Sequence, residues 1–339
     1  MAASRPSSPD RADAIERAPG SRAMDLSVAV CTYSRAGMLA RCLERLAAQR
    51  VGAGMAWEVI VVDNNSADAT AQTVERACGE ARIPGLRRVV EPRQGVAFAR
   101  RRGLAEARGR LVAFVDDDCL LAPGWVAAAI EFARAHPAAG AFGGRIRLAW
   151  DEPPSPLALL YGESLAAQDW GDEAFRLPMS GRRCPVGAGL VVDRDAACAS
   201  GWGERGRLTG RCGGALGAGE DTELVLFIRH AGFEVWYAPA LVLEHAIEPA
   251  RTTLAYLRDL HRGFGRAEPY LRALAHRPAP RLSDRLASAL WALGEMARVA
   301  ARWPRGYLQY APERPTWLIR LSYARGCLAG AARYLAGRV

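Results

Sequence analysis

Three consecutive carboxylates, Asp116, Asp117 and Asp118, directly follow the apolar run 111–115. Such a run predicts a strand buried on both faces, as in a parallel sheet covered by helices. Carboxylates this close repel one another unless a cation neutralises them, and oxygen ligands suit Mg²⁺ or Mn²⁺. Because strand side chains alternate between faces, we expect Asp116 and Asp118 on one side and Asp117 on the other. The triplet is a candidate metal site, and a solvated acidic turn is the alternative.

A second acidic group, Glu220, Asp221 and Glu223, follows the stretch 201–219, which holds eight glycines in 19 positions. So many glycines make ordering costly, which predicts a mobile loop. A helix carrying Leu224 is expected to begin at the acidic group. Acidic residues in a first turn can simply favour the helix dipole. A carboxylate held after a flexible loop is also suited to act as a general base.

Two other predicted strands, 26–31 and 57–62, also end in polar residues. The first is followed by 32–35 and the second by 63–65, and a helix is expected after each turn. Strands alternating with helices at this spacing imply right-handed crossovers and a mostly parallel sheet flanked by helices, an α/β fold class. Ligands of such sheets bind beyond the carboxyl ends of the strands. The polar turns and the acidic triplet should therefore share one edge of the sheet.

Further elements are predicted along the chain. Strands are expected near 86–91, 140–148 and 184–192, helices near 95–108 and 125–136, and two short strand-like runs at 233–237 and 241–243. The segment 151–181 breaks this rhythm and carries several prolines, which is typical of an insertion or lid.

Common nucleotide-binding motifs are missing from the sequence. No GxGxxG follows the first predicted strand, and GxxxxGK[ST] is absent because the chain has no lysine. An edge with Asp, Asn and Arg side chains suits a nucleotide whose diphosphate is bound through a metal ion.

Composition and charge divide the chain into three parts. The composition of residues 1–23 predicts a disordered leader, and these residues lack the apolar run of a signal peptide. Residues 24–250 hold the pattern of alternating strands and helices. Residues 251–339 carry 16 Arg against 5 acids, so the net charge of +9 comes from this extension. The eight cysteines are scattered without metal-binding spacing, which indicates a reducing compartment and a cytoplasmic protein.

The basic extension predicts amphipathic helices at 252–266, 282–303 and 317–336. Charged residues interrupt the last two, so neither is expected to cross a membrane. Basic helices with tryptophan and tyrosine could lie on the inner face of the plasma membrane, or they could pack as a cap on the rest of the protein. Nucleic-acid binding is not expected, because no recognised binding motif accompanies the arginines.

Six motifs in this order resemble those of the family-2 glycosyltransferases, which have the GT-A (Rossmann-like) fold, over about residues 26–250. They are 28–35 (VAVCTYSR), 61–66 (VVDNNS), 95–103 with Arg100, 114–118 (FVDDD), 219–224 (GEDTEL) and 237–245 with His245.

The resemblance implies roles for the matching residues. It places the nucleotide-sugar donor at Thr32, Tyr33, Arg35, Asp63, Asn65, Gly95, Arg100, Asp116 and Asp117. It assigns Asp116, Asp118 and His245 to an Mn²⁺ or Mg²⁺ site, and Asp221 to the catalytic base. For His245 a structural role at a strand end is the alternative. The family commonly has Asn after the arginine of the donor site, whereas this chain has Arg101.

The resemblance also implies a reaction. A hexosyltransferase-like enzyme would move a sugar from a nucleotide-diphosphate donor, UDP-sugar by default, to a hydroxyl of a saccharide, lipid-linked or small-molecule acceptor, in polysaccharide or glycolipid biosynthesis. One displacement with one base predicts inversion at the anomeric carbon. The alternatives are a non-catalytic nucleotide-sugar-binding subunit and a sugar-phosphate nucleotidyltransferase. The usual glycine-rich first loop of the latter, with its basic residue, is not matched by 32–37.

Overall fold

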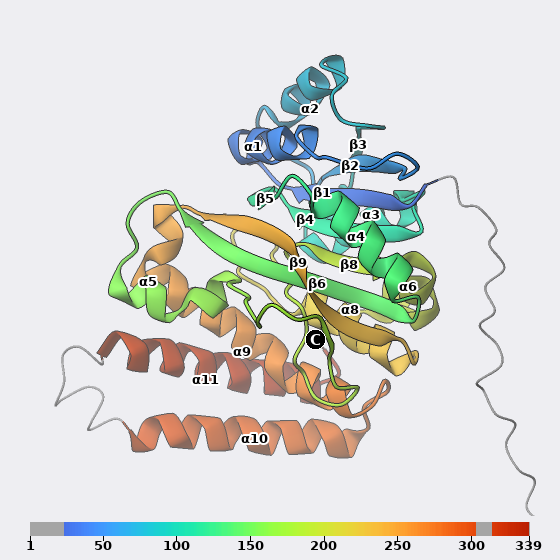
Figure 1. The fold of residues 1–339 in the computed structure, drawn as a ribbon. Coiled ribbons are helices and arrows are strands. Elements are labelled where there is room, and N and C mark those ends of the chain that lie inside the picture. Colours follow the sequence, from blue (N-terminus) through green and yellow to red (C-terminus); the bar gives the residue numbers. More distant parts are fainter. Residues whose placement is uncertain (1–23, 303–313, 339) are drawn as a thin grey trace, which may run out of the picture.

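The computed structural model describes residues 24–302 and 314–338, so the leader expected at 1–23 lies outside the described residues. A nine-stranded sheet runs through the protein, with helices on both faces (Figure 1). The strand order is β3 (Arg87–Val90), β2 (Trp57–Asp63), β1 (Leu26–Thr32), β4 (Leu111–Asp116), β8 (Leu190–Asp193), β6 (Ala139–Trp150), β9 (Glu234–Ile247) and β5 (Cys119–Leu121), with β7 (Phe175–Arg176) paired to β9. The predicted α/β class is confirmed.

The first four strands form a parallel half-sheet, as the sequence predicts. β1 and β2 are buried along their whole length because their apolar side chains serve both faces. Val28 and Val30 pack with α1 (Ala36–Ala47), α2 (Thr70–Gly79) and α4 (Trp125–Ala135) on one face. Ala29 and Cys31 pack with α3 (Val96–Glu106), α6 (Arg194–Ser200) and α8 (Glu220–His230) on the other.

The other half of the sheet is mixed rather than parallel. β8 is antiparallel to both β4 and β6, whereas β6 and β9 are parallel. The two short runs expected at 233–237 and 241–243 form one continuous strand, β9. Pro239 has no N–H to give to the ladder, and a register shift between β6 and β9 opposite this segment accommodates it without ending the strand.

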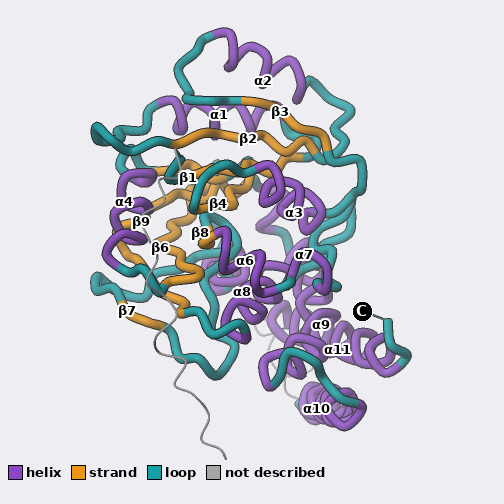
Figure 2. Tube along the Cα trace, turned by 90° about the vertical axis from the view of Figure 1, so that its right-hand side faces the viewer, coloured by secondary structure: helices purple, strands orange, loops and turns teal. Residues whose placement is uncertain are grey.

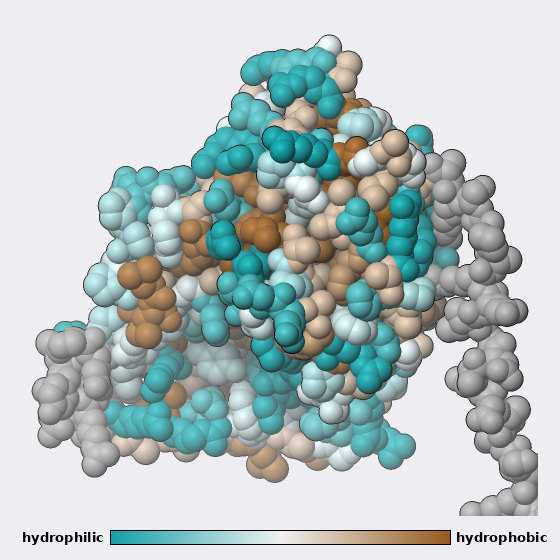
Figure 3. Space-filling view, viewed as in Figure 1, coloured by the Kyte–Doolittle hydropathy of each residue, from teal (hydrophilic) through white to brown (hydrophobic). Residues whose placement is uncertain are grey.

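Short elements occupy the segments that lack a regular pattern. They are α5 (Pro156–Leu160), the 3₁₀ helix η2 (Gly162–Leu165), α7 (Trp202–Arg205) and the 3₁₀ helix η3 (Pro249–Thr252). Apolar side chains are exposed over α5 and along the lower edge of the molecule, where α10 (Leu282–Ala301) lies (Figure 3).

The basic extension forms three helices that stack at one end of the protein, next to α8 (Figure 2). α9 (Leu254–His276) packs directly on the domain, since its Leu271 and Leu274 join the apolar core that contains Phe114 and Leu224. α11 (Arg314–Leu335) packs on α9, and α10 is the outermost helix (Figure 1). Within the described residues, no helix is both long and apolar enough to cross a membrane.

Glycines allow α9 and α11 to pack at very short range. A Cβ atom built on Gly265 would lie 2.2 Å from the carbonyl oxygen of Tyr323, and one built on Gly326 would lie 2.3 Å from that of Arg262. Real Cβ atoms do not approach so closely, so any larger residue at either position would push the two helices apart.

We therefore expect Gly326→Ala to lower the free energy of unfolding by about 1–3 kcal/mol, the usual cost of overpacking. Gly294→Ala in α10 is the matched control, because the added Cβ would meet only the Arg298 guanidinium, at 3.8 Å. Helix propensity alone should make that control neutral or up to about 1 kcal/mol more stable. Urea unfolding followed by tryptophan fluorescence measures both. Equal stabilities for the two variants would contradict the close contact.

Candidate functional site

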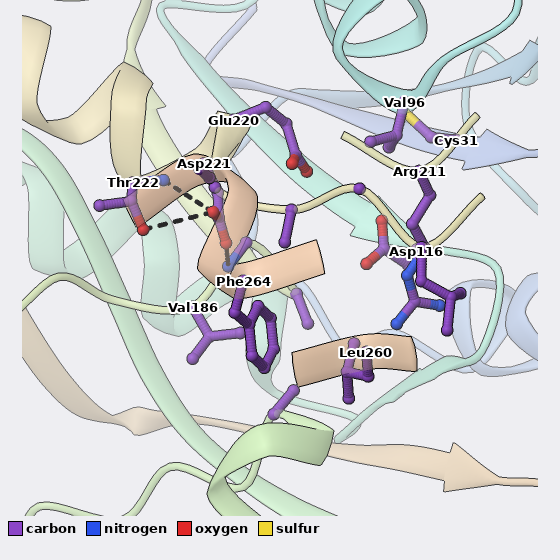
Figure 4. Close-up of a pocket in the computed structure, with 18 of the residues that line it drawn as sticks. Cys31, Val96, Asp116, Val186, Arg211, Glu220, Asp221, Thr222, Leu260 and Phe264 are labelled. Carbon is purple, nitrogen blue, oxygen red and sulfur yellow. Dashed lines mark hydrogen bonds between the residues drawn. The ribbon is translucent and has the colours of Figure 1, made fainter. Parts of the chain in front are cut away.

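The carboxyl ends of β1 and β4 open into a cavity of about 1010 Å³. The opposite wall is formed by the first turn of α8 and by one face of α9. Figure 4 shows Asp116 and Asp221 approaching the cavity from different elements, with Leu260 and Phe264 of α9 beneath them. The structure therefore brings the acidic triplet together with Glu220 and Asp221 of the distant acidic group, whereas Glu223 points away and binds Trp202 and the Arg207 N–H.

Nine of the expected site residues line this cavity. They are Thr32, Tyr33, Arg35, Arg100, Asp116, Asp117, Asp118, Asp221 and His245. The other three expected donor contacts do not line it. The Asp63 carboxylate accepts from the Ser66 N–H at 2.8 Å and pairs with Arg88 of β3 at 2.7 Å, which fixes it to its own turn and to the neighbouring strand. Asn65 is exposed, and Gly95 donates its N–H to the Asn64 side chain at 2.9 Å.

The acidic triplet is held by arginines. Arg35 Nη1 donates to Asp117 at 2.6 Å and to Asp118 at 2.8 Å, and Arg251 Nη2 reaches Asp118 at 2.8 Å. Asp117 also accepts from the Thr32 hydroxyl at 2.7 Å. The expectation that Asp117 faces away from Asp118 is wrong, because β4 ends at Asp116 and strand alternation ends with it.

Burial acts differently on the two inner carboxyls. Burial, helped by the charge of Asp118, raises the pKa of Asp117 above its usual range. Asp118 is equally buried, but His245 and Arg251 outweigh that burial and hold its pKa well below the usual range. Asp118 is therefore the member of the pair that keeps its negative charge.

The histidine beside Asp118 gives the donor set of a cation site. His245 Nδ1 lies 2.8 Å from the carbonyl oxygen of Leu165, which can only accept, so Nδ1 carries a proton. The other ring nitrogen, Nε2, lies 3.2 Å from Asp118 Oδ1. Arg251 Nη1 is 3.4 Å from the same nitrogen. Nε2 is therefore the ring nitrogen available to bind a cation beside the Asp118 oxygen.

Asp116 extends this donor set. Ligand atoms of Asp116, Asp118 and Cys119 lie within 4.8 Å of one another. Burial raises the pKa of the Cys119 thiol well above its usual range, which leaves the two carboxylates as the better donors. Carboxylate oxygens with one imidazole nitrogen fit Mn²⁺ or Mg²⁺. The residues expected to hold the metal, Asp116, Asp118 and His245, therefore fit one.

A buried arginine connects the two acidic groups of the site. Arg100 on α3 donates to Glu220 at 2.9 Å and lies 3.4 Å from Asp116. Burial raises the pKa of Glu220 to about 7, although the positive charge of Arg100 opposes the rise. The start of α8 is thus tied to the end of β4 through one side chain.

The carboxylate of Asp221 has a defined position at the start of α8. Its Oδ2 accepts from the Gly187 N–H at 2.8 Å, and its Oδ1 accepts from the Thr222 N–H at 2.7 Å (Figure 4). A Cβ built on Gly187 would lie 2.8 Å from Asp221 Oδ2 and 2.7 Å from Arg100 Nη2. Glycine at 187 therefore allows the carboxylate and the guanidinium to sit together. Oδ1 also accepts from the Thr222 hydroxyl at 3.4 Å, so Oδ2 is the oxygen that retains a lone pair for a substrate proton.

Three residues of the site were not among those expected from the sequence. Glu220 was visible as an acid next to Asp221, but nothing in the sequence indicated its pairing with Arg100. Arg251 is one of 16 arginines in the basic extension and has no local signal that separates it from the others. Asn64 lines the cavity in place of Asn65, and its side-chain amide donates to the carbonyl oxygens of Glu91 and Arg93.

Comparisons with known sequences identify a family of transferases. The family described as glycosyl transferase family 2 matches residues 27–197. The succinoglycan biosynthesis protein ExoM of Rhizobium meliloti (strain 1021) is 29% identical over 261 residues, which are 75% of this chain and 76% of that protein. The dodecaprenyl-phosphate galacturonate synthase of Rhizobium johnstonii (strain DSM 114642 / LMG 32736 / 3841) is 32% identical over 99 residues, 29% of each chain.

Solved structures share the fold. The mannosyltransferase PcManGT from Pyrobaculum calidifontis, in complex with GDP-Man and Mn²⁺, has a TM-score of 0.54 at 20% identity, over 93% of this chain and 88% of that one. S. aureus TarS 1–349 in complex with UDP-GlcNAc has a TM-score of 0.53 at 15% identity, over 93% of each chain. At these identities the likeness concerns the fold alone, and it is the GT-A fold.

The raised pKa of Glu220 predicts a pH dependence of stability. A carboxyl whose pKa is raised on folding stabilises the protein below its unfolded pKa of about 4.5, and this stabilisation is lost as the pH rises through about 7. Glu220→Gln removes this titration. Between pH 5 and pH 8 the urea midpoint of the variant should therefore fall less than that of the wild type. Parallel midpoint curves for the two proteins would argue against the shift.

Proposed function

This chain belongs to glycosyl transferase family 2, and from that premise we propose that it is an inverting, metal-dependent enzyme acting on a nucleotide-diphosphate sugar. The observation that carries the proposal is the convergence of two distant acidic groups on one cavity. The candidate base Asp221 and the candidate metal ligands Asp116 and Asp118 line the same space, with Arg100 paired to Asp116 and next to Asp221. This arrangement supports a catalyst over a subunit that only binds the donor.

The diphosphate end of the donor fits the side of the cavity with Asp118 and His245. A divalent cation bound there would offset the negative charge that develops on the leaving diphosphate. Arg35 and Arg251, which already reach Asp118, add two permanent positive charges at the same position. The protein thus collects positive charge where the leaving group becomes more negative.

Asp221 is proposed as the general base. The acceptor hydroxyl gives its proton to the carboxylate while its oxygen forms a bond to the anomeric carbon, and the bond from that carbon to the diphosphate oxygen breaks. The products are the glycoside and the nucleoside diphosphate. One displacement from the face opposite the leaving group inverts the anomeric configuration.

The acceptor is proposed to enter over α9. Val186, Leu260 and Phe264 form an apolar strip below Asp221 (Figure 4). Such a strip can pack against the C–H face of a sugar while its hydroxyls turn towards the carboxylate. The names of the two Rhizobium relatives, one in succinoglycan biosynthesis and one a dodecaprenyl-phosphate galacturonate synthase, support a saccharide or lipid-linked acceptor in polysaccharide or glycolipid synthesis.

The donor is proposed to be a UDP-sugar, with a GDP-sugar as the second candidate. The structures of similar fold were solved with UDP-GlcNAc and with GDP-Man, which supports a nucleotide sugar for this chain. A thermal-shift screen of nucleotide sugars with and without Mn²⁺ identifies the donor, because a ligand bound only to the folded state raises Tm.

Replacing the base tests the proposed reaction. Asp221→Asn should lower kcat by about 10²–10⁴-fold, the usual contribution of general-base catalysis. Donor affinity, measured by calorimetry, should stay unchanged because the amide keeps the size of the carboxylate. Asp259→Asn on α9 is the control, since Asp259 is exposed and does not line the cavity.

Two results would reject this role. Wild-type turnover in Asp221→Asn would remove Asp221 as the base. A product that keeps the anomeric configuration of the donor, as read from its proton NMR coupling constants, would rule out a single displacement.

A metal titration tests the cation site. Asp118→Asn and His245→Gln should each weaken Mn²⁺ binding by about 10-fold or more in the presence of nucleoside diphosphate, because each removes a ligand atom. Cys119→Ala is the matched control, since the neighbouring thiol is expected to stay protonated and outside the ligand set. Mn²⁺ titration by calorimetry measures all three. A loss of binding in the cysteine variant alone would redirect the assignment to Cys119.

A further inference from the structure

The outermost helix, α10, turns four leucine side chains outward. Leu282, Leu286, Leu290 and Leu293 are 64%, 50%, 70% and 58% exposed. Their spacing of four, four and three residues places them on one face of the helix. We call these four residues the leucine ridge; brown side chains mark the lower edge of Figure 3, where α10 lies.

The inner face of the same helix packs through other side chains. Ser288, Ala292 and Val299 are its buried residues, and Trp291 and Met296 are partly buried beside them. A surface helix of a globular protein ordinarily buries its largest apolar residues and exposes polar ones. In α10 the four leucines of the ridge stay exposed, so packing among the residues that the structure describes does not bury them. Exposed apolar stripes of this kind mark surfaces that contact another molecule or a membrane.

The charged residues around the leucine ridge indicate what kind of surface it can bind. In the described parts of α10 and α11, the exposed charged residues are all arginines: Arg298, Arg314, Arg320, Arg325 and Arg333. The two acids of α10 are only partly exposed and are paired, Asp284 with Arg277 at 3.3 Å and Glu295 with Arg298. An apolar ridge accompanied by positive charge is complementary to an anionic lipid leaflet, where leucines enter the acyl boundary and arginines meet the headgroups.

We propose that α10 docks this protein on an anionic membrane, lying parallel to the surface with the leucine ridge buried in it. The docking goes beyond the proposed reaction and does not depend on it. It would also place the cavity near the lipid, because α9 lines the cavity with Leu260 and Phe264 and contacts α11 through Gly265 on another side. A lipid-linked acceptor could then reach Asp221 while its tail stays in the membrane.

Vesicle co-sedimentation of the full chain tests the docking. Wild-type protein should sediment with vesicles of phosphatidylglycerol and phosphatidylcholine in equal parts, and much less with phosphatidylcholine alone. Binding should fall as the salt concentration rises from about 0.1 M to about 0.5 M. The triple variant Leu286→Gln, Leu290→Gln, Leu293→Gln should bind at least about tenfold more weakly, because it removes the apolar surface that enters the lipid.

Two further variants separate the contributions. Leu290→Gln alone should weaken binding, whereas Val90→Gln should not, because Val90 is 42% exposed on β3 at the far end of the protein (Figure 1). The double variant Arg325→Gln, Arg333→Gln should bind more weakly and with less dependence on salt. An unchanged donor-induced rise in Tm would show that each variant is folded.

Three outcomes would overturn the proposal. The first is absence of wild-type binding to the anionic vesicles, and the second is equal binding by the triple variant. The third is a wild-type dimer that becomes monomeric in the triple variant without any vesicle binding, which would assign the ridge to a second copy of the chain. Asp221→Asn should still dock, so loss of the proposed reaction and loss of docking are distinguishable.

Discussion

Burying carboxylates beside guanidinium groups is the constraint on which this structure depends. An unpaired buried charge is strongly destabilising, so each buried acid of the site needs its cation. Arg35 and Arg251 reach Asp118, and Arg100 reaches Glu220 and Asp116. These contacts attach the loop after β1, the start of α8 and the segment after β9 to the end of β4. Residues more than 200 positions apart in sequence are thereby joined: Arg35 Nη2 donates to Glu248 Oε2 at 2.7 Å.

The same contacts prepare the site for an anionic ligand. Arg35 and Arg251 are held in place before any diphosphate binds, so little side-chain freedom remains to be lost. Glu220, whose pKa burial raises to about 7, fixes Arg100 next to the proposed base. α9 completes the arrangement, because one of its faces closes the cavity and another supports α11 and, through it, α10. The basic extension is thus continuous with the site and with the surface proposed to bind lipid.

Local patterns explain why much of the fold was predictable. Runs such as 28–31 and 111–115 are apolar on every residue, which is what a strand covered by helices on both faces requires. The predictions were wrong where contacts between distant parts of the chain determine the local structure. β9 was expected as two short strands, but it continues through Pro239 because a register shift in its pairing with β6 accommodates the proline. Asp117 turns towards Asp118 because Arg35 binds both carboxylates. Asp63 pairs with Arg88 of the neighbouring strand, a contact that no spacing along the chain indicates, and its contact with the donor stays a prediction.

The sequence by itself determined the order of strands and helices, the family, and nine of the residues that line the cavity, because these follow from periodicity and from short motifs. Only the tertiary structure decided which charges neutralise one another. Glu220 and Arg251 became part of the site through partners on other elements, and the carbonyl oxygen of Leu165 decides which ring nitrogen of His245 faces Asp118. It also decided which face of α10 is exposed. Hydropathy marks the leucines as apolar, but which face of α10 packs on α11 is decided by the three-dimensional fit, and that face carries Ala292, Val299, Trp291 and Met296.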